Sequence, residues 1–257
     1  MDKKYFLNSI NHEDKNLISN IYNKMKIAEK TNKIIFISEF LSPAIWTQIS
    51  EICENYKIKS YTNGIFKDSD RRMLAFSSYE EPLIYPMNLL KIINNSKFCT
   101  LHHKDYLGAI MSLGIKREKL GDLIISDTIC YAPVCSDICS YIINNLNDIG
   151  NCPCEVSEYD YKLLKLPERK FEEKVIISTS LRLDGMVAAI CNISRSKSVV
   201  LIASGKILVN YLQCEKKDKI IKPNDTLTIR GYGKLKVSDI KGTTQKERLK
   251  VEIMQYI

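Results

Sequence analysis

The sequence predicts an α+β protein of three blocks: a small N-terminal α/β unit over residues 1–80, a central βαββαβ domain over 81–178 and a compact C-terminal domain over 179–257. Two observations support this division. Helix-type and strand-type apolar spacings alternate along the first two blocks, whereas the excess of positive charge is confined to the third. With 45% hydrophobic and 26% charged residues, the chain has the composition of a globular protein.

The N-terminal block begins with an amphipathic helix over about 14–30, because apolar residues recur there at intervals of three and four. Residues 33–38 are a short apolar run typical of a strand. A serine followed by proline at 42–43 then opens a second helix, since serine caps helix N-termini and proline suits the first helical position. Strands over 57–66 and 71–77 complete a small α/β unit.

The central block alternates in the order βαββαβ. The predicted elements are a strand over 87–93, a helix over 103–113, strands over 122–126 and 128–134, a helix over 136–149 and a strand over 152–158. This order is the ferredoxin-like arrangement that RNA-recognition motifs (RRMs) share. Those motifs stack bases on aromatic side chains of their central strands, and the corresponding strand here offers one aromatic residue, Tyr131. The block is therefore predicted to be RRM-like in topology, without ordinary base stacking.

The C-terminal block is organised around two short helices followed by a strand. Leu183, Val187 and Ile190 fall on one face of the first helix. Ser194 suits the N-cap of the second helix, and Gly205 suits the left-handed position that ends it.

The first turn of the second helix carries Arg195 and Lys197, although the helix dipole favours acidic residues at this end. Two interpretations are open. A helix N-terminus with free N–H groups, a capping hydroxyl and two cations is a suitable phosphate site. Alternatively, both residues are solvated surface charges.

The distribution of charge along the chain is uneven. Residues 178–257 contain 15 Lys and Arg against 7 Asp and Glu, whereas the preceding 177 residues contain 23 of each. The net charge of +8 therefore belongs to the C-terminal block. Such asymmetry predicts nucleic-acid binding. Membrane-surface binding is the alternative, but no basic amphipathic helix with bulky aromatic residues accompanies the charge.

Motifs of the C-terminal block resemble the S4 RNA-binding domain over residues 181–231. The matching motifs are Arg182-Leu183-Asp184, Ser194-Arg195-Ser196, Ser204-Gly205-Lys206-Ile207-Leu208-Val209-Asn210 and Pro223-Asn224-Asp225-Thr226-Leu227. Asn224 stands where glycine is usual, but asparagine also tolerates a left-handed turn. The resemblance implies recognition of folded RNA through its backbone and 2′-hydroxyl groups. The RNA-binding residues that it implies are Arg182, Ser194, Arg195, Ser196, Lys197, Lys206, Asn210 and Arg230. Asp184 is expected to brace Arg182 or a neighbouring backbone group rather than to contact phosphate.

Most of the chain resembles the YlmH family of bacterial proteins, which are often encoded near cell-division genes. The family segments are present as His103-Lys104-Asp105-Tyr106-Leu107-Gly108-Ala109 and Gly114-Ile115-Lys116-Arg117-Glu118-Lys119-Leu120-Gly121-Asp122. The resemblance implies a ribosome-associated RNA-binding protein. Its implied partners are the rRNA of the large subunit and, as in some members, peptidyl-tRNA during rescue of stalled translation. A second ribosome or tRNA contact is expected through His103, Lys116 and Arg117; the alternative for this segment is a solvated basic turn.

Nine cysteines in a chain without an export signal predict free thiols rather than a disulfide framework. Cys135 and Cys139 lie in a predicted helix rather than on the turns that zinc knuckles use, so neither a metal nor another cofactor is expected. The sequence has no run of 18 apolar residues and no signal-peptide core. We therefore expect a cytoplasmic monomer without membrane association.

RNA-modifying activity is the alternative function, because S4 domains are often joined to enzymes. Pseudouridine synthases use an Arg-Leu-Asp motif, but here Arg182-Leu183-Asp184 opens the S4 helix itself, and no second copy with a downstream catalytic domain follows. Methyltransferases need a glycine-rich βα turn, and the sequence contains no G-x-G-x-x-G. We therefore expect a non-enzymatic protein that binds structured rRNA or tRNA.

Overall fold

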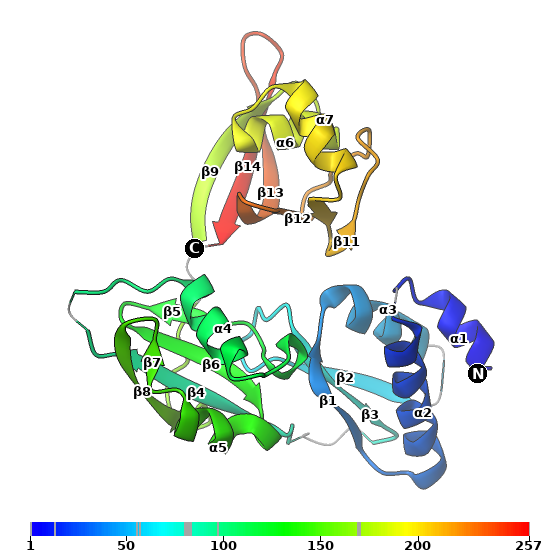
Figure 1. Cartoon of the computed structure of the whole chain (residues 1–257). Coiled ribbons are helices and arrows are strands. Elements are labelled where there is room, and N and C mark those ends of the chain that lie inside the picture. Colours follow the sequence, from blue (N-terminus) through cyan, green and yellow to red (C-terminus); the bar gives the residue numbers. More distant parts are fainter. Residues whose placement is uncertain are drawn as a thin grey trace. The chain divides into compact units, whose positions relative to one another are not determined.

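In a computed structural model, the chain folds into two compact units, Met1–Glu168 and Arg169–Ile257 (Figure 1). The structure describes residues 2–12, 14–54, 56, 58–79, 84–96, 98–168 and 171–256. Over these residues it contains seven α-helices and fourteen β-strands, so the predicted α+β class is confirmed. The N-terminal and central blocks both lie in the first unit, each around its own sheet.

The N-terminal sheet is small and antiparallel, with strand order β1-β3-β2. Its elements are α1 (Lys3–Ser9), α2 (Lys15–Thr31), β1 (Ile35–Leu41), α3 (Pro43–Glu54), β2 (Lys59–Asn63) and β3 (Arg72–Ser77). α2 starts near the predicted position because the Asp14 side chain accepts hydrogen bonds from the N–H groups of Asn16 and Leu17 at 2.9 and 3.0 Å. Helix α1 lies outside the predicted elements and contributes Phe6 to the core.

The central sheet is antiparallel, with strand order β5-β6-β4-β8-β7. Its elements are β4 (Met87–Asn94), α4 (His103–Ser112), the 3₁₀ helix η1 (Arg117–Lys119), β5 (Ile124–Ser126), β6 (Ile129–Cys135), α5 (Ser136–Asn145), β7 (Asp148–Ile149) and β8 (Cys152–Tyr159). Apart from the short β7, the elements follow each other as βαββαβ. Tyr106 of α4 and Ile142 of α5 are buried in the core of this domain. α5 ends before residue 149 because Leu146 adopts extended backbone and the chain forms the β7–β8 hairpin.

Cys99 and Cys152 form a disulfide with their Cα atoms 6.4 Å apart, so the prediction of free thiols was wrong for this pair. The two residues are 53 positions apart, and the fold brings them together. The Asn94 side chain donates to the Cys99 carbonyl at 2.8 Å and holds this loop near the sheet. The other seven cysteines are free, and burial raises the pKa of Cys135 to about 12. Among the described residues, no group of three or more His, Cys, Asp and Glu side chains is suited to hold a metal ion.

The C-terminal unit is a six-stranded antiparallel sheet with two helices on one face (Figure 1). Its elements are β9 (Phe171–Ser178), α6 (Leu183–Cys191), α7 (Arg195–Ala203), β10 (Ile207–Val209), β11 (Leu212–Gln213), β12 (Thr226–Ile229), β13 (Gly233–Thr243) and β14 (Leu249–Tyr256), and the strand order is β11-β10-β12-β13-β14-β9. Leu183, Val187 and Ile202 from the helices share the core with Leu227 and Val251 from the strands. Residues 171–178, assigned to the central block on sequence grounds, belong to this sheet because β9 pairs with β14 over eight positions.

Within the described part of the chain, no single helix has the length and apolar composition needed to cross a membrane. The pair α6 and α7 passes that test when the two are taken together, and they are bent by 110° relative to each other.

Candidate nucleic-acid interface

Two arginines converge on one buried carboxylate where α6 begins. The Asp184 side chain is 4% exposed, and Arg195 Nη2 lies 2.9 Å from its Oδ2. Arg195 Nε also donates to Oδ2 at 3.1 Å, while Arg182 donates through Nε and Nη2 at 3.3 Å each. The predicted bracing of Arg182 by Asp184 is confirmed, and Arg195 shares the same carboxylate. The arginine side chains remain 36% and 54% exposed, so both present cationic groups to solvent.

The turn between α6 and α7 produces this convergence. Asn192 takes a left-handed φ of 52° and ends α6. As predicted, Ser194 caps α7, and its hydroxyl accepts a backbone N–H at 3.3 Å. The buried Ser198 hydroxyl lies 2.8 Å from the carbonyl oxygens of both Asp184 and Arg195. These contacts hold the first turns of the two helices together, so that Arg195 reaches a carboxylate eleven residues earlier in the chain.

The electrostatics of the junction keep Asp184 ionised. Burial favours the protonated carboxyl group, but the hydrogen bonds from Arg182 and Arg195 outweigh burial and lower the pKa of Asp184. The carboxylate also offsets the positive charge that Arg195 places at the positive end of the α7 dipole. The unusual first turn therefore has a compensating anion, which lies in the preceding helix.

Five of the eight predicted RNA-binding residues meet at this junction. They are Arg182, Ser194, Arg195, Ser196 and Lys197. The hydroxyl oxygens of Ser194 and Ser196 lie 3.1 Å apart, and Lys197 is exposed. Guanidinium, ammonium and hydroxyl groups together supply hydrogen-bond donors for phosphate oxygens.

A lysine-rich loop lies against the same helix start. The Leu183 N–H donates to the Lys219 carbonyl at 2.8 Å, and the Asp184 N–H donates to the Lys217 carbonyl at 3.0 Å. Four exposed lysines of this loop were missing from the predicted site: Lys216, Lys217, Lys219 and Lys222. The available signal was the run of four lysines against two acidic residues over 215–222. We call the five junction residues and these four lysines the α6–α7 surface.

The other three predicted residues lie elsewhere in the unit. Lys206 and Arg230 are neighbours beyond the C-terminal end of α7, where the Arg230 N–H donates to the Lys206 carbonyl at 3.0 Å. The nine residues of α7 separate its two ends by about 13 Å. Asn210 is engaged within the fold, because its amide donates to Asp225 Oδ1 at 2.7 Å and accepts the Thr226 N–H at 2.8 Å.

The predicted second contact is spread over the central domain. His103 is the exposed first residue of α4, and Lys116 is exposed beyond the end of that helix. The ten residues of α4 span about 15 Å, and Lys116 follows four residues after its last residue, Ser112. The main chain of His102 and the side chain of Asp105 form part of a capping box, with the His102 N–H donating to Asp105 Oδ2 at 2.8 Å.

Arg117, the third residue of that predicted contact, turns into the fold. Its Nη1 donates to the carbonyl oxygens of Leu120 and Gly121 at 2.7 and 3.2 Å. Burial, together with the nearby Arg71, lowers the pKa of Arg117 to about 10. The Arg71 guanidinium likewise donates to a main-chain carbonyl, that of Phe40, at 2.7 Å. These arginines tie main-chain segments together.

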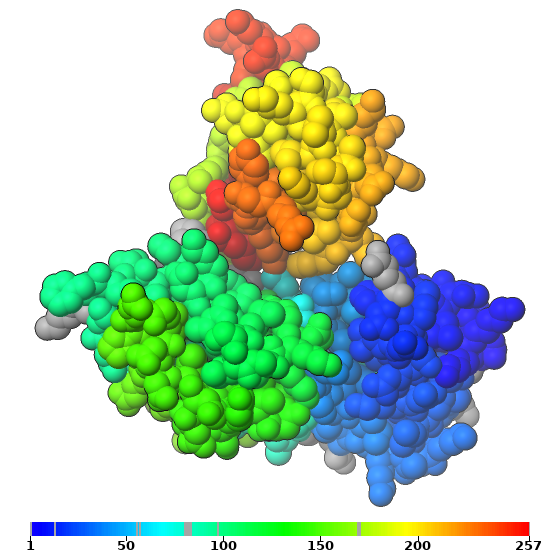
Figure 2. Space-filling model, in the orientation of Figure 1, coloured from blue at the N-terminus to red at the C-terminus, as the bar shows by residue number. Residues whose placement is uncertain are grey.

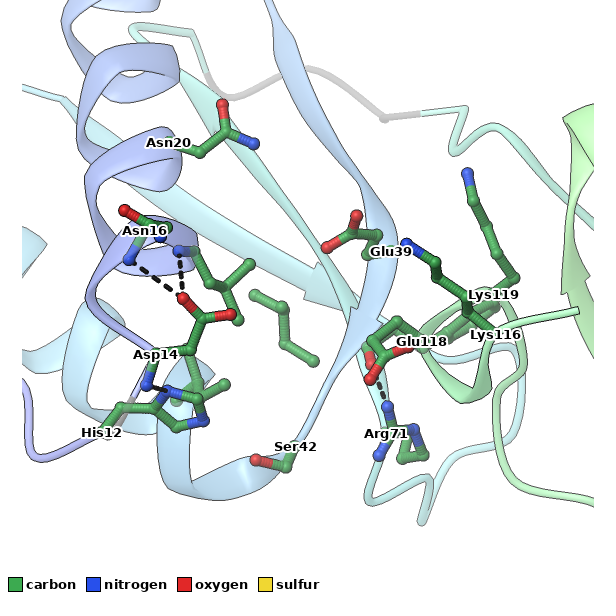
Figure 3. A pocket seen from close by; sticks show the side chains of 14 residues that line it. His12, Asp14, Asn16, Asn20, Glu39, Ser42, Arg71, Lys116, Glu118 and Lys119 are labelled. Atoms are coloured by element: carbon green, nitrogen blue, oxygen red, sulfur yellow. Dashed lines mark hydrogen bonds between the residues drawn. The ribbon is translucent and has the colours of Figure 1, made fainter.

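A cavity of about 590 Å³ opens beside this segment, next to the start of α2, β1 and η1 (Figure 3). Its charged and titratable lining residues are His12, Asp14, Glu39, Arg71, Lys116, Glu118 and Lys119. Asp14 caps α2, and Lys119 forms an ion pair with Asp137 at 2.6 Å. Figure 3 shows Glu118 close to Lys116 and Lys119. The cavity is therefore of mixed charge, unlike the α6–α7 surface.

Comparison with known proteins supports one family. Residues 83–163 match a family model described as "Putative RNA-binding domain in YlmH". The chain is 27% identical over 218 residues to "Ribosome-associated protein quality control protein P2" of Bacillus subtilis (strain 168). The aligned residues make up 84% of this chain and 85% of that protein. These matches support the YlmH family. The resemblance predicted from the sequence is confirmed.

A solved YlmH structure agrees in fold. "Cell division protein ylmH from Streptococcus pneumoniae" has a TM-score of 0.51 at 17% identity, over 58% of this chain and 93% of that chain. At this identity the likeness concerns the fold alone. The YlmH family model lies on the central domain, whereas the predicted RNA-binding residues gather in the C-terminal unit. The chain thus has two candidate regions for RNA contact.

Proposed function

We propose that this YlmH-family protein is a non-enzymatic RNA-binding protein that binds structured rRNA on the large ribosomal subunit. The α6–α7 surface of the C-terminal unit, an S4 domain, makes the principal contact. One observation carries this proposal: the buried Asp184 carboxylate holds two guanidinium groups beside a lysine-rich loop. The name of the Bacillus subtilis relative supports a role in ribosome-associated quality control of stalled large subunits.

The α6–α7 surface has the chemistry to recognise RNA by shape. Because Asp184 orients Arg182 and Arg195 before RNA arrives, these side chains lose little conformational freedom when they bind phosphate. The exposed lysines add sequence-independent affinity by neutralising phosphates and releasing counterions. The hydroxyls of Ser194 and Ser196 can hydrogen-bond phosphate oxygens or 2′-hydroxyl groups, which are the features that folded RNA presents.

The RRM-like central domain supplies the second contact, to the ribosome or to peptidyl-tRNA. The description of its family model supports RNA binding by this domain, and the exposed Lys116 is the best-placed residue of the predicted set. Two weak contacts on one chain reinforce each other through effective concentration. We expect the protein to act as a monomer in the cytoplasm, where ribosomes are found.

The surroundings of Asp184 argue against the alternative, an RNA-modifying enzyme that uses the Arg-Leu-Asp motif. A catalytic carboxylate must come within hydrogen-bond reach of its substrate. Here the carboxylate is 4% exposed and both oxygens already accept hydrogen bonds from Arg195. This arrangement suits a structural anchor.

Cosedimentation with purified large ribosomal subunits tests the proposal in the full-length chain. The variant Lys216→Gln, Lys217→Gln, Lys219→Gln removes three exposed charges of the loop. Three exposed lysines of the N-terminal block provide a matched control with the same net charge: Lys4→Gln, Lys33→Gln, Lys67→Gln.

The loop variant should associate less with the large subunit. In a plot of log binding constant for structured rRNA against log salt concentration, its slope should be smaller by about 2–3, because each lost phosphate contact removes roughly 0.7–0.9. The control should bind like the wild type. Equal binding by loop variant and wild type would contradict the proposal. Mass spectrometry of incubated RNA provides a separate test, because a new base modification would favour the enzyme alternative.

A further inference from the structure

The C-terminal unit carries a projecting hairpin that the S4-like motifs do not include. β13 pairs with β12 over Gly233–Lys236 but continues, paired with β14, as far as Thr243. On the other side of β14, β9 ends at Ser178, opposite Leu249. At roughly 3.3 Å per residue, β13 therefore runs about 20 Å beyond its last pairing with β12. Figures 1 and 2 show the turn of this hairpin projecting from the unit. We call residues 238–250 the basic arm.

The turn of the basic arm is held by its own hydrogen bonds. The Thr244 N–H donates to the Arg248 carbonyl at 2.8 Å, and the Arg248 N–H donates to Thr244 Oγ1 at 3.1 Å. The Glu247 N–H donates to the Thr244 carbonyl at 2.9 Å, and Glu247 takes a left-handed φ of 55°. A turn ordered in this way loses little entropy when it meets a partner.

The outer part of the basic arm is cationic. Lys246, Arg248 and Lys250 are exposed and line a groove of about 500 Å³ together with Ile177, Thr244 and Gln245. Within the described chain, these three cations form no ion pair. Lys241, nearer the body of the sheet, is instead paired with Asp239 at 3.7 Å and Glu252 at 3.2 Å. Three uncompensated cations around one groove fit a polyanion.

The position of the basic arm connects it with the α6–α7 surface. The end of β9 that flanks the arm packs against the first turn of α6, where a Cβ on Gly185 would lie 3.4 Å from Ser178 Oγ. Ser178 Oγ also donates to the Ser180 carbonyl at 2.7 Å. Arg182 lies four positions after Ser178, a reach of at most about 14 Å. The arm and the arginine pair therefore flank the same end of β9.

We propose that the basic arm binds phosphate groups of the same RNA that the α6–α7 surface contacts. The partner is the RNA backbone, because the groove presents cations without an aromatic platform for bases and continues a surface with the same chemistry. This inference rests on the proposed function and adds a second, separate element to the RNA interface.

Fluorescence anisotropy with a labelled RNA stem–loop, measured over a range of salt concentrations, tests the inference in the full-length chain. The arm variant is Lys246→Gln, Arg248→Gln, Lys250→Gln, and the control is the N-terminal triple Lys4→Gln, Lys33→Gln, Lys67→Gln. The arm variant should bind about tenfold or more weakly at physiological salt, with a log–log slope lower by about 2–3. The control should retain the wild-type slope.

A photoreactive amino acid at Gln245 provides a direct readout, since it should cross-link to the stem–loop at low salt. Wild-type affinity and slope in the arm variant, or no cross-link from position 245, would overturn the inference. If the arm variant binds normally but the loop variant of the α6–α7 surface loses RNA affinity, the proposed function holds and only the role of the basic arm is refuted. Failure of the wild-type chain to bind RNA would overturn both.

Discussion

The α6–α7 surface and the central 103–122 segment contain similar basic residues, but the fold uses their arginines in opposite ways. At the α6–α7 surface the carboxylate of Asp184 is buried, and Arg182 and Arg195 cover it with their side chains partly in solvent. In the central segment Arg117 itself turns inward, and main-chain carbonyls accept its hydrogen bonds. In this protein, Arg182 and Arg195 stay accessible to a ligand because a buried carboxylate holds them at the surface. Arg117 instead stabilises a loop, because main-chain carbonyls accept its hydrogen bonds.

Of the changes that test this comparison, removal of the buried carboxylate of Asp184 should have the largest effect. Asp184→Asn keeps the side-chain size but leaves Arg182 and Arg195 without their counter-charge. We expect the C-terminal unit to lose about 2–3 kcal/mol of unfolding free energy, less than for a fully buried pair because both arginines are partly exposed. RNA affinity should also fall, since the guanidinium groups are no longer oriented.

Circular dichroism during urea denaturation measures this loss. The single tryptophan, Trp46, lies in the first unit, so its fluorescence transition should not move. Asp218→Asn, an exposed acidic residue of the lysine-rich loop, is the matched control and should change stability by less than about 0.5 kcal/mol. Equal effects from Asp184→Asn and Asp218→Asn would refute the anchoring role.

A smaller effect is expected in the central segment, where two adjacent basic residues should behave differently. Arg117→Ala leaves the carbonyls of Leu120 and Gly121 without their donor and should cost the first unit about 1–2 kcal/mol. Lys116→Ala should be neutral within about 0.5 kcal/mol but should weaken association with large ribosomal subunits. Trp46 fluorescence and cosedimentation measure the two outcomes. An Arg117→Ala protein of normal stability and weakened ribosome association would show that Arg117, too, is a contact residue.

The smallest expected effect is the change in stability of the C-terminal unit at acidic pH. The lowered pKa of Asp184 means that, below about pH 4, the unfolded chain takes up a proton that the folded unit does not. The unfolded state then binds more protons, so this contribution to stability rises with pH and is complete above the ordinary carboxyl pKa of about 3.9. It is lost as the pH falls through the folded-state pKa.

Urea midpoints of the C-terminal unit, measured from about pH 3 to pH 6, test the sign of this effect. Asp184→Asn should give a shallower pH dependence than the wild type, because the titrating group is gone. Parallel curves for the two proteins would mean that Asp184 does not carry the acid sensitivity.

Local signals in the sequence were sufficient where an element is a continuous pattern. Asp14 before a helical repeat predicts the start of α2, and the apolar runs of the central domain predict its βαββαβ order. β9 could not be assigned in the same way, because its partner β14 is the last strand in the chain. The bond between Cys99 and Cys152 likewise depends on a contact across 53 residues.

In the candidate site, too, local features were predictable from the sequence and contacts between distant residues were not. The Ser194 cap is a local feature and was predictable. The pairing of Arg195 with Asp184 depends on the bend between the two helices, which the sequence does not specify. Asn210 matched a motif, but its amide is engaged by Asp225 and by the neighbouring main chain. Contacts between separate elements therefore decide which motif side chains remain available to a ligand.

The pairing of β9 with β14 has a consequence for synthesis of the protein. The first and last strands of the C-terminal unit are neighbours, and the rings of Phe171 and Tyr256 lie 5.0 Å apart at their ends. As the chain leaves the ribosome, β9 emerges first and has no partner until residues 249–256 follow. α6 packs against β9, so the nascent unit completes its α6–α7 surface only after β14 has emerged.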